Sequence, residues 1–337
     1  MEVLSLCPFR AVGLVWQPRP SAYSLLVACK GTFELTPGVS RLAEVQDYPN
    51  EDDNHWDDDP KRSLYSASDL VPTKARADVL LVGHAFAPYG QEADSFVTRL
   101  VVGEVAKAIE VVAERAWTAE PHVRYGSRIT KASLRYERAA GGPDTWNPVG
   151  VPLDAAPEAF GMAPLPALQP PGFMLVRRDV RMPPVGYGPL APSWPLRKDK
   201  LGRHAASFNA ARWHLAPLPS DLDPACFNAA PEDQQTAEIH PDERIELVNL
   251  HPDVPHLVTT LPGLKPRVFV ERSGRPPEEM LLRCDTLWID TDRQIATVTW
   301  RGQVALAGRD EPGRVLVAME PPGRTLSFID IDRLLGR

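Results

Sequence analysis

Short runs of hydrophobic residues, bounded by glycine and proline, recur along the chain and predict β-strands. Residues 24–35 (SLLVACKGTFEL) are rich in β-branched and aromatic side chains, and Gly31 within them is typical of a bulge. Residues 77–88 (ADVLLVGHAFAP) have the composition of a buried strand with one glycine interruption. Residues 128–139 (RITKASLRYERA) alternate between two faces, so they predict a half-buried strand.

Further strands are predicted where valine-rich stretches meet short turns. Residues 96–117 divide at Gly103. The Ala, Glu and Lys residues of the second half would allow a helix, but the Gly-Glu turn between valine-rich stretches favours a hairpin of two strands. Residues 281–290 and 294–302 are joined by the short polar turn TDR, which indicates a second hairpin. Residues 314–321 predict one more strand.

Helical patterns are short throughout the chain. No strongly periodic stretch of about twelve residues or more is present, and residues 327–337 have the pattern of a short helix with Ser327 as its cap. The predicted fold class is therefore mainly β, with antiparallel, sandwich-like sheets, long proline-rich loops and a few short helices.

The middle of the chain has an unusual composition. Residues 141–195 contain thirteen of the 36 prolines and seven of the 22 glycines, so they cannot form helices or central strands. Large side chains recur in this segment and favour an ordered structure; they are Trp146, Phe160, Phe173, Met174, Leu175, Tyr187 and Trp194. We expect a single domain over residues 1–337, or two β subdomains at about 1–140 and 196–337 joined by this ordered segment.

The overall composition narrows the class of protein. The chain has 337 residues, of which 43% are hydrophobic and 24% charged, as expected of a soluble globular protein. The net charge is −7 and the Lys and Arg residues are dispersed, so we expect no nucleic-acid partner. No apolar run is long enough to span a membrane. We therefore expect no membrane partner. The acidic run 51–59 (EDDNHWDDD) is typical of a solvated loop, although it could face a basic partner.

The N-terminus and the cysteines favour a cytoplasmic location. The first ten residues contain Glu2 and lack the basic start and apolar run of a secretion signal. The four cysteines lie far apart without a CxxC pair, which is typical of reduced, buried thiols; they are Cys7, Cys29, Cys226 and Cys284.

Specific catalytic and ligand motifs are absent from the chain. It contains no GxxxxGK[ST], no GxGxxG after a strand, no GxSxG and no HExxH. His251 and His256 are five residues apart, but no cysteine or carboxylate set nearby has the spacing of zinc ligands. We therefore expect no catalytic residues, no cofactor and no metal.

The best candidate for a functional site is the loop 218–235 (LPSDLDPACFNAAPEDQQ). Its carboxylates could supply general acid and base chemistry, as in a glycosidase, if they faced each other across a cleft. Asp and Asn also bind backbone N–H groups in turns, and Asn228 and Pro231 could open one helical turn. The candidate residues are Asp221, Asp223, Phe227, Asn228, Glu232, Asp233 and Gln234.

An ordered series of stretches resembles one bacterial family, domain-of-unknown-function family 2169 (DUF2169). The stretches cover nearly the whole chain; they are DLVPTKARADVLLVGHAFAPYG (69–90), VGEVAKAIEVVAERAW (102–117), LRYERAAGGPDTWNPVG (134–150), PPVGYGPLAPSWPLR (183–197), the loop 218–235 and DTLWIDTDRQIATVTWRG (285–302). The chain departs from the family pattern at three places. Ala140 stands where the family usually has an aromatic residue. Residues 202–213 lack the family's Tyr-Asp pair, and residues 239–250 lack the glycine that the family tends to carry before the ELVNL strand. These departures concern loops, where partner choice is encoded.

The resemblance implies a function in type VI secretion. Members are expected to act as non-enzymatic cytoplasmic adaptors, or chaperones, that bind a toxin effector and help to load it onto the VgrG spike. The loop 218–235 would then be a docking loop, with carboxylates as a polar rim and Phe227 either as an exposed anchor or as part of the core. The alternatives are a carboxylate-dependent hydrolase acting on carbohydrate or peptide, and a structural component of the secretion particle.

Overall fold

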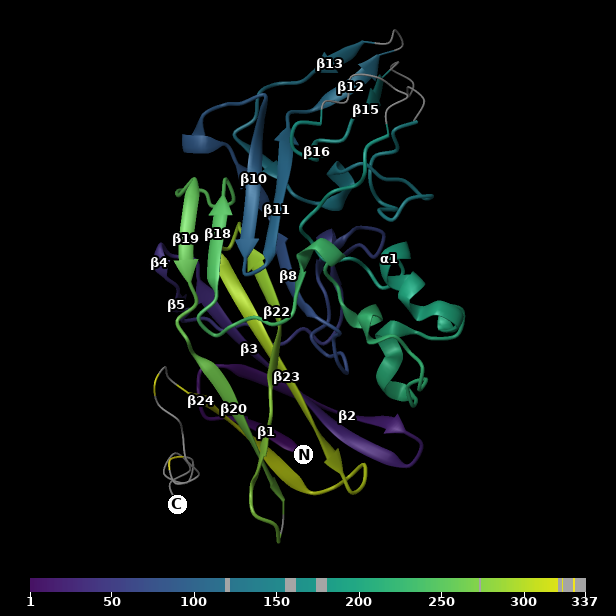
Figure 1. Ribbon diagram of the computed structural model, residues 1–337, viewed down its shortest axis with the longest axis vertical. Helices are drawn as coiled ribbons and strands as arrows, with labels where there is room; N and C mark the ends of the chain where they lie inside the picture. The colour runs from purple at the N-terminus through teal and green to yellow at the C-terminus, as the bar shows by residue number, and fades with distance from the viewer. Residues whose placement is uncertain are drawn as a thin grey trace.

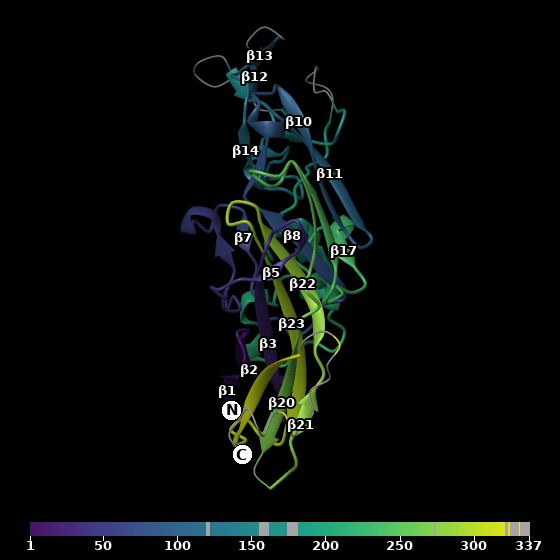
Figure 2. The same ribbon diagram turned by 90° about the vertical axis from the view of Figure 1, so that its left-hand side faces the viewer.

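The protein is mainly β, with several mostly antiparallel sheets, so the predicted fold class is confirmed. The computed structural model describes residues 1–118, 122–154, 162–173, 181–272 and 274–320, together with Gly323 and Asp330. Two perpendicular views show that the molecule is elongated (Figure 1 and Figure 2).

The largest sheet has seven strands. They are β2 (Arg10–Arg19), β3 (Ala22–Glu34), β5 (Arg41–Leu42), β8 (Ala77–Val82), β17 (Gln235–Thr236), β22 (Arg283–Asp290) and β23 (Ile295–Leu306). Their order is β17-β8-β22-β23-β3-β2, with β5 also on β3, and only β8 and β22 pair in parallel. Nearly all residues of β3, β8 and β22 are buried, so the centre of this sheet is covered on both faces.

The second sheet has six strands in the order β16-β11-β10-β18-β19-β4. They are β4 (Gly38–Val39), β10 (Ser95–Val102), β11 (Val105–Val112), β16 (Leu168–Gln169), β18 (Arg244–Val248) and β19 (His256–Thr260). Burial alternates along β10, as expected for a strand with one face on the core. The β10–β11 hairpin turns at Gly103, whose φ of 53° is easily adopted by glycine.

Smaller sheets complete the ends and flanks of the molecule. A four-stranded sheet, β1-β24-β20-β21, consists of β1 (Glu2–Ser5), β20 (Lys265–Arg272), β21 (Glu278–Met280) and β24 (Gly313–Glu320). A three-stranded sheet lies at the opposite end of the molecule (Figure 1). Its strand order is β13-β12-β15, and it consists of β12 (Arg115–Thr118), β13 (Val123–Tyr125) and β15 (Met162–Pro164). The remaining pairs are β6 (Asn54–His55) with β7 (Leu64–Ser66), and β9 (His84–Phe86) with β14 (Lys131–Ser133).

Helical segments are short and lie mostly on one flank of the sheets (Figure 1). They are α1 (Pro195–Lys198), η1 (Trp56–Asp58), η2 (Pro88–Gly90), η3 (Tyr136–Arg138), η4 (Asp199–His204), η5 (Ala210–Leu215), η6 (Pro224–Phe227) and η7 (Glu232–Gln234), where η marks a 3₁₀-helix. In the described part of the chain, no helix has the length and apolar character needed to cross a membrane.

The main hydrophobic core joins the three largest sheets. Fully buried side chains come from β3, β8, β10, β18 and β20 and belong to one cluster; examples are Val27, Val79, Leu100, Leu247 and Val268. Because this cluster collects side chains from distant parts of the sequence, the sheets form one continuous packing unit.

Most predicted strands are confirmed, and one is wrong. Strands occupy the predicted stretches 24–35, 77–88, 96–117, 281–302 and 314–321. The remaining stretch, 128–139, was predicted as one strand. It contains only the short β14 followed by the turn η3, because Tyr136 is drawn into a buried aromatic cluster and its hydroxyl donates to the Gly188 carbonyl at 3.0 Å. The predicted C-terminal helix 327–337 falls, apart from Asp330, outside the described residues.

The proline-rich segment contributes buried anchors in its described parts. Tyr187 and Trp194 are buried, and Trp146 packs edge-on against Tyr136 with ring centroids 5.8 Å apart. Phe160, Met174 and Leu175 lie outside the described residues. Strands from residues 1–140 and from residues 196–337 pair with one another in both of the largest sheets, so strand pairing does not follow a division into those two halves.

Candidate functional site

The loop 218–235 consists of two 3₁₀ turns, η6 and η7, with an extended stretch between them. Asp223 caps η6, because its carboxylate accepts a hydrogen bond from the Ala225 N–H at 2.9 Å. Pro231 occupies the N-cap position of η7. The sequence allows Asn228 to open this turn, but Asn228 does not cap it. Asn228 instead holds the extended stretch to the neighbouring sheet.

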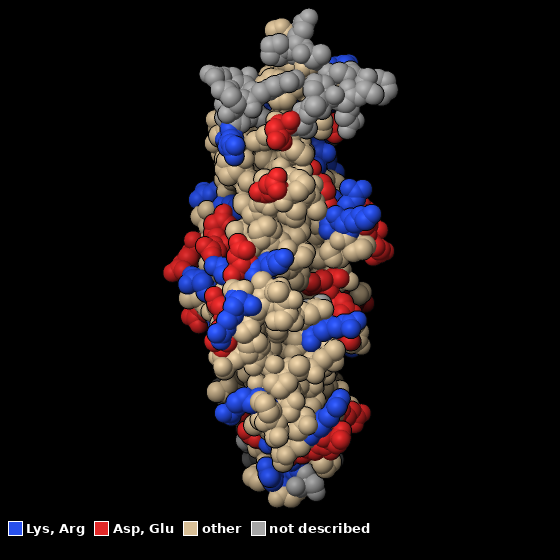
Figure 3. Space-filling model, turned by 90° about the vertical axis from the view of Figure 1, so that its right-hand side faces the viewer, with Lys and Arg blue, Asp and Glu red and all other residues tan. Residues whose placement is uncertain are grey.

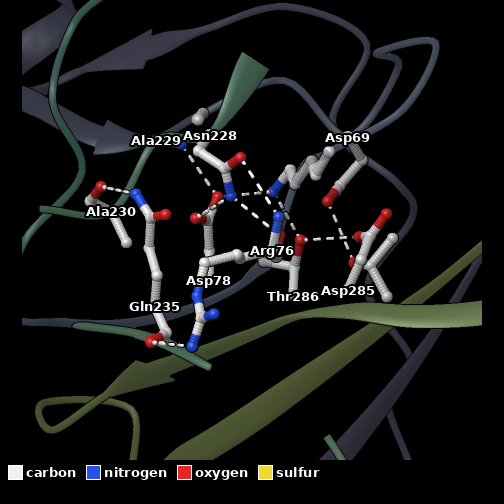
Figure 4. A network of polar contacts seen from close by, with 12 residues as sticks. Asp69, Arg76, Asp78, Asn228, Ala229, Ala230, Gln235, Asp285 and Thr286 are labelled. Carbon is white, nitrogen blue, oxygen red and sulfur yellow. Dashed lines mark hydrogen bonds and ion pairs between the residues drawn. The ribbon is translucent and has the colours of Figure 1, made fainter. Parts of the chain in front are cut away.

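Asn228 and the next residue fix the loop to strand β8 through one buried carboxylate (Figure 4). The Asn228 amide donates to Asp78 Oδ1 and to the Arg76 carbonyl, both at 2.8 Å, and its oxygen accepts from the Ala75 N–H at 3.0 Å. The Ala229 N–H donates to the other carboxylate oxygen of Asp78 at 2.8 Å. The middle of the loop is therefore attached to the seven-stranded sheet by hydrogen bonds to Arg76 and Asp78.

The negative charge of Asp78 is balanced inside the protein by Lys74. The Lys74 ammonium lies 2.8 Å from Asp78 and donates to the Thr286 hydroxyl at 2.6 Å, and both charged side chains are buried. Two further buried pairs lie nearby: Lys30 of β3 pairs with Asp69 of the segment before β8, and Arg301 of β23 pairs with Asp285 of β22. A buried charge needs such a partner, because its desolvation is otherwise uncompensated.

Gln234 fixes the end of the loop. Its amide donates to the carbonyls of Val79 and Tyr187, both at 2.8 Å, and its oxygen accepts from the Lys107 ammonium at 2.8 Å. The loop thereby joins β8, the proline-rich segment and β11 of the second sheet. This one side chain connects the two largest sheets.

The middle of η6 is held by aromatic packing and by a buried arginine. Phe227 packs edge-on against Trp213, with ring centroids 6.2 Å apart, and belongs to a small apolar cluster with Trp16. Arg197 of α1 donates to the Cys226 carbonyl at 3.2 Å and to the Leu190 carbonyl at 2.8 Å. These contacts position α1 beside the loop.

Three of the seven predicted docking residues are therefore internal. Phe227, Asn228 and Gln234 are at most 2% exposed, so they cannot contact a partner without a rearrangement of the loop. Phe227 is part of the core, which is one of the two readings that the sequence allowed. In this structure these three side chains shape the loop from inside and do not lie at its surface.

The carboxylates of the loop lie at its surface and are mostly paired with cations. Asp221 accepts a hydrogen bond from His204 at 2.9 Å and lies 2.5 Å from Arg203; the hydrogen bond is the main cause that lowers the pKa of Asp221. Glu232 lies 2.6 Å from Lys200, and this hydrogen bond raises the pKa of Lys200. The same carboxylates thus form a charged rim around the loop.

Asp233 pairs with Lys107 at the edge of a shallow hollow. Burial lowers the pKa of Lys107, and the nearby Asp233 carboxylate at 3.0 Å opposes this effect. The hollow has a volume of about 570 Å³, and its apolar walls include Trp146 and Leu196. Its charged walls include Asp199, Lys200, Glu232 and Asp233.

We call this feature the loop hollow; it is lined by Lys107, Trp146, Pro184, Val185, Leu196, Asp199, Lys200, Pro231, Glu232 and Asp233. It brings together Glu232 and Asp233 from the predicted set, whereas Asp221 and Asp223 do not line it. Leu196 is 39% exposed although it is a large hydrophobic side chain. Apolar and charged side chains also occur together in protein-binding patches.

Sequence reasoning missed several residues of the site. The walls formed by Lys107, Trp146 and Leu196 come from segments that only the fold places beside the loop. Asp78 did carry a signal, because it is a lone carboxylate within the apolar strand ADVLLV. Such a residue predicts a buried polar partner, but the partner Asn228 lies 150 positions away.

The pair His251 and His256 was considered as metal ligands. The Nδ1 atom of buried His251 accepts hydrogen bonds from the N–H groups of Asp253 and Val254, both at 3.2 Å, so this nitrogen serves the turn. His256 is exposed and lies 3.2 Å from Glu246. Over the described ranges, no three His, Cys, Asp or Glu side chains gather in an arrangement that could hold a metal ion.

Comparison with known proteins identifies one related group. A family model described as "Uncharacterized protein conserved in bacteria (DUF2169)" matches residues 21–301, which is most of the chain. No curated protein and no solved structure matches the chain. The matched region contains the whole loop 218–235 and every residue that lines the loop hollow.

Proposed function

The chain belongs to the DUF2169 family of bacterial proteins, and from that premise we propose that it is a cytoplasmic adaptor for type VI secretion. In this role it binds a toxin effector, as a chaperone does, and helps to load it onto the VgrG spike. The protein carries out no reaction on its partner. The observation that carries the proposal is the loop hollow, whose walls combine apolar and charged side chains.

The surface around the loop hollow supports a role in protein binding. Figure 3 views the molecule from the side on which α1 lies in Figure 1, and uncharged residues occupy most of the middle of this face. Lys, Arg, Asp and Glu lie mainly nearer to its two sides. Leu196 and Leu215 are exposed hydrophobic side chains of the helical segment on this flank. Burial of such exposed apolar side chains against a partner contributes favourably to binding.

The anchoring of the loop supports the same role. The hydrogen bonds of Asn228, Ala229 and Gln234 hold the backbone before any partner arrives. A loop that is ordered in advance loses less conformational entropy on association, so more of the contact energy contributes to affinity. The charged rim adds steering and selectivity for a partner of complementary charge.

The proposal is tested by co-expressing the protein with the toxin encoded beside its gene. We expect the toxin to co-purify with the wild type and to become more soluble. Leu196→Asp places a charge on the apolar wall of the hollow and should weaken the complex about tenfold or more, as expected for a lost hydrophobic anchor.

Leu281→Asp is the matched control, because Leu281 is 85% exposed and does not line the loop hollow. This variant should bind like the wild type. A toxin that neither co-purifies nor gains solubility with the wild type would contradict the adaptor function. Equal binding by both leucine variants would retain the adaptor function but place the contact on another surface.

A further inference from the structure

A second hollow is lined by residues of β12, β13 and β15. These strands lie at one end of the molecule, away from α1 (Figure 1). The volume of the hollow is about 540 Å³, within the range of small-ligand sites. We call it the arginine hollow, because three arginines line it: Arg115, Arg124 and Arg138. Its apolar walls are formed by Val151, Met162, Leu165 and Ala167, among others.

Arg115 is buried and forms no ion pair within the described part of the chain, where Tyr125 and Glu110 act on it only through longer-range electrostatics. Its side chain is part of a residue that is only 5% exposed, and its Nε atom has no hydrogen-bond partner. One guanidinium nitrogen donates to the Pro166 carbonyl at a long 3.4 Å, and no carboxylate within the described residues pairs with it. A guanidinium has five N–H donors, and the Nε donor of Arg115 is buried and unused. Burial also lowers the pKa of Arg115.

Arg138 repeats this pattern on the other side of the same hollow. Its Nε atom is buried and has no hydrogen-bond partner. Its closest carboxylate is that of Glu114 at 3.5 Å, and the Glu114 side chain is 80% exposed, so the pair is weak. One buried guanidinium, that of Arg115, and one partly exposed guanidinium, that of Arg138, therefore line the hollow, and each has a buried Nε atom without a hydrogen-bond partner among the described residues.

The other charged groups of the hollow do not neutralise Arg115. Both carboxylate oxygens of Glu137 are engaged by Ser63, at 2.8 Å from its N–H and 2.7 Å from its hydroxyl. Arg124 is exposed and contacts the Met162 sulfur at 3.6 Å. With three arginines and two glutamates in the lining, the net charge of the hollow is 3 − 2 = +1.

We propose that the arginine hollow is a binding site for a carboxylate group, held by the guanidinium of Arg115 with Arg138 as a second donor. The planar guanidinium forms paired hydrogen bonds with a carboxylate, and these are the strong hydrogen bonds of proteins. The net charge of +1 matches one carboxylate better than a phosphate, which carries about −1.5 to −2 at neutral pH. The apolar walls accommodate a short hydrocarbon body. This site does not depend on the proposed adaptor function.

The test is thermal unfolding of the full chain with four probes at matched ionic strength: N-acetyl-leucine, butyrate, inorganic phosphate and chloride. We expect N-acetyl-leucine and butyrate to raise the melting temperature above that in chloride, because a ligand that binds the folded state stabilises it. Arg115→Met should weaken carboxylate binding about tenfold or more, and Arg138→Met several-fold. Tighter binding of N-acetyl-leucine than of butyrate indicates a peptide carboxylate as the ligand, and equal binding indicates a free acid.

Arg19→Met is the matched control, because Arg19 is an exposed arginine at the end of β2, outside the hollow. It should respond to carboxylates as the wild type does. A response to phosphate alone, no response to any probe beyond chloride, or full carboxylate binding by Arg115→Met would each overturn the proposal. Arg138→Met keeps the test decisive if Arg115→Met folds poorly, because the Arg138 side chain is partly exposed.

Discussion

Two buried cations, Lys74 beside the loop 218–235 and Arg115 in the arginine hollow, are held in opposite ways. The Lys74 ammonium lies 2.8 Å from Asp78 and also donates to Thr286. Arg115 has one long hydrogen bond to a backbone carbonyl and an Nε atom without a partner. Both residues are 5% exposed, so burial alone does not distinguish them.

The difference separates a structural charge from one that is available to a ligand. A paired buried charge stabilises the fold only as long as both partners remain, because removing one leaves the other desolvated. An unpaired buried charge already carries that desolvation penalty, so its removal is tolerated in the absence of a ligand. Substitutions that remove each cation can therefore test whether the two regions differ in role.

The largest expected effect is that of Lys74→Met. This change leaves the Asp78 carboxylate buried without its counter-charge, so the free energy of unfolding should fall by about 3–5 kcal/mol. Urea denaturation followed by circular dichroism measures it. Lys61→Met, at an exposed lysine, is the control and should change stability by no more than about 0.5 kcal/mol. Equal stability of the two variants would show that the Lys74 pair contributes nothing.

Asn228→Ala should have the next largest effect. It removes two hydrogen bonds donated by the Asn228 amide and leaves Asp78 Oδ1 and the Arg76 carbonyl without that donor. The free energy of unfolding should fall by about 1–3 kcal/mol. Proteolysis within residues 218–235 should also become faster, because the loop loses its attachment to β8. Unchanged proteolysis would contradict the anchoring role.

The Asp69 pair predicts a dependence of stability on pH. Burial raises the pKa of this carboxyl, but the charge and hydrogen bonds of Lys30 and the Asn50 N–H outweigh it, so the pKa is lowered overall. A lowered pKa in the folded state stabilises the protein above the ordinary Asp value of about 4, and this contribution is lost as the pH falls through the folded pKa. Asp69→Asn should flatten the loss of stability below pH about 4, measured by urea denaturation. Identical pH profiles would refute this account.

Arg115→Met should have the smallest effect on stability. Because no carboxylate pairs with Arg115 in the described structure, the free energy of unfolding in chloride buffer should stay within about 1 kcal/mol of the wild type, or rise. The measurement is the same urea denaturation as for Lys74→Met. A loss as large as that of Lys74→Met would assign Arg115 a structural role and remove the contrast between the two regions.

Local patterns in the sequence predicted the strands well. The runs 24–35, 77–88 and 281–302 are strands because their apolar residues fill the interior of a sheet, and Gly103 allows the turn of the β10–β11 hairpin. The failure at 128–139 has a tertiary cause: the alternation there is real, but Tyr136 bends out of the strand into an aromatic cluster. The composition of the loop 218–235 also marked it correctly as irregular and turn-rich.

By itself, the sequence determined the mainly β class, the family and the position of an irregular polar loop, since these depend on local spacing and residue type. Only the tertiary structure decided which side chains of that loop are accessible. Asn228 meets Asp78 across 150 positions, and Gln234 meets Tyr187 across 47, so their burial depends on contacts that no local pattern encodes. The same holds for Arg115, because whether a charged residue has a partner is decided by the segments that the fold brings around it.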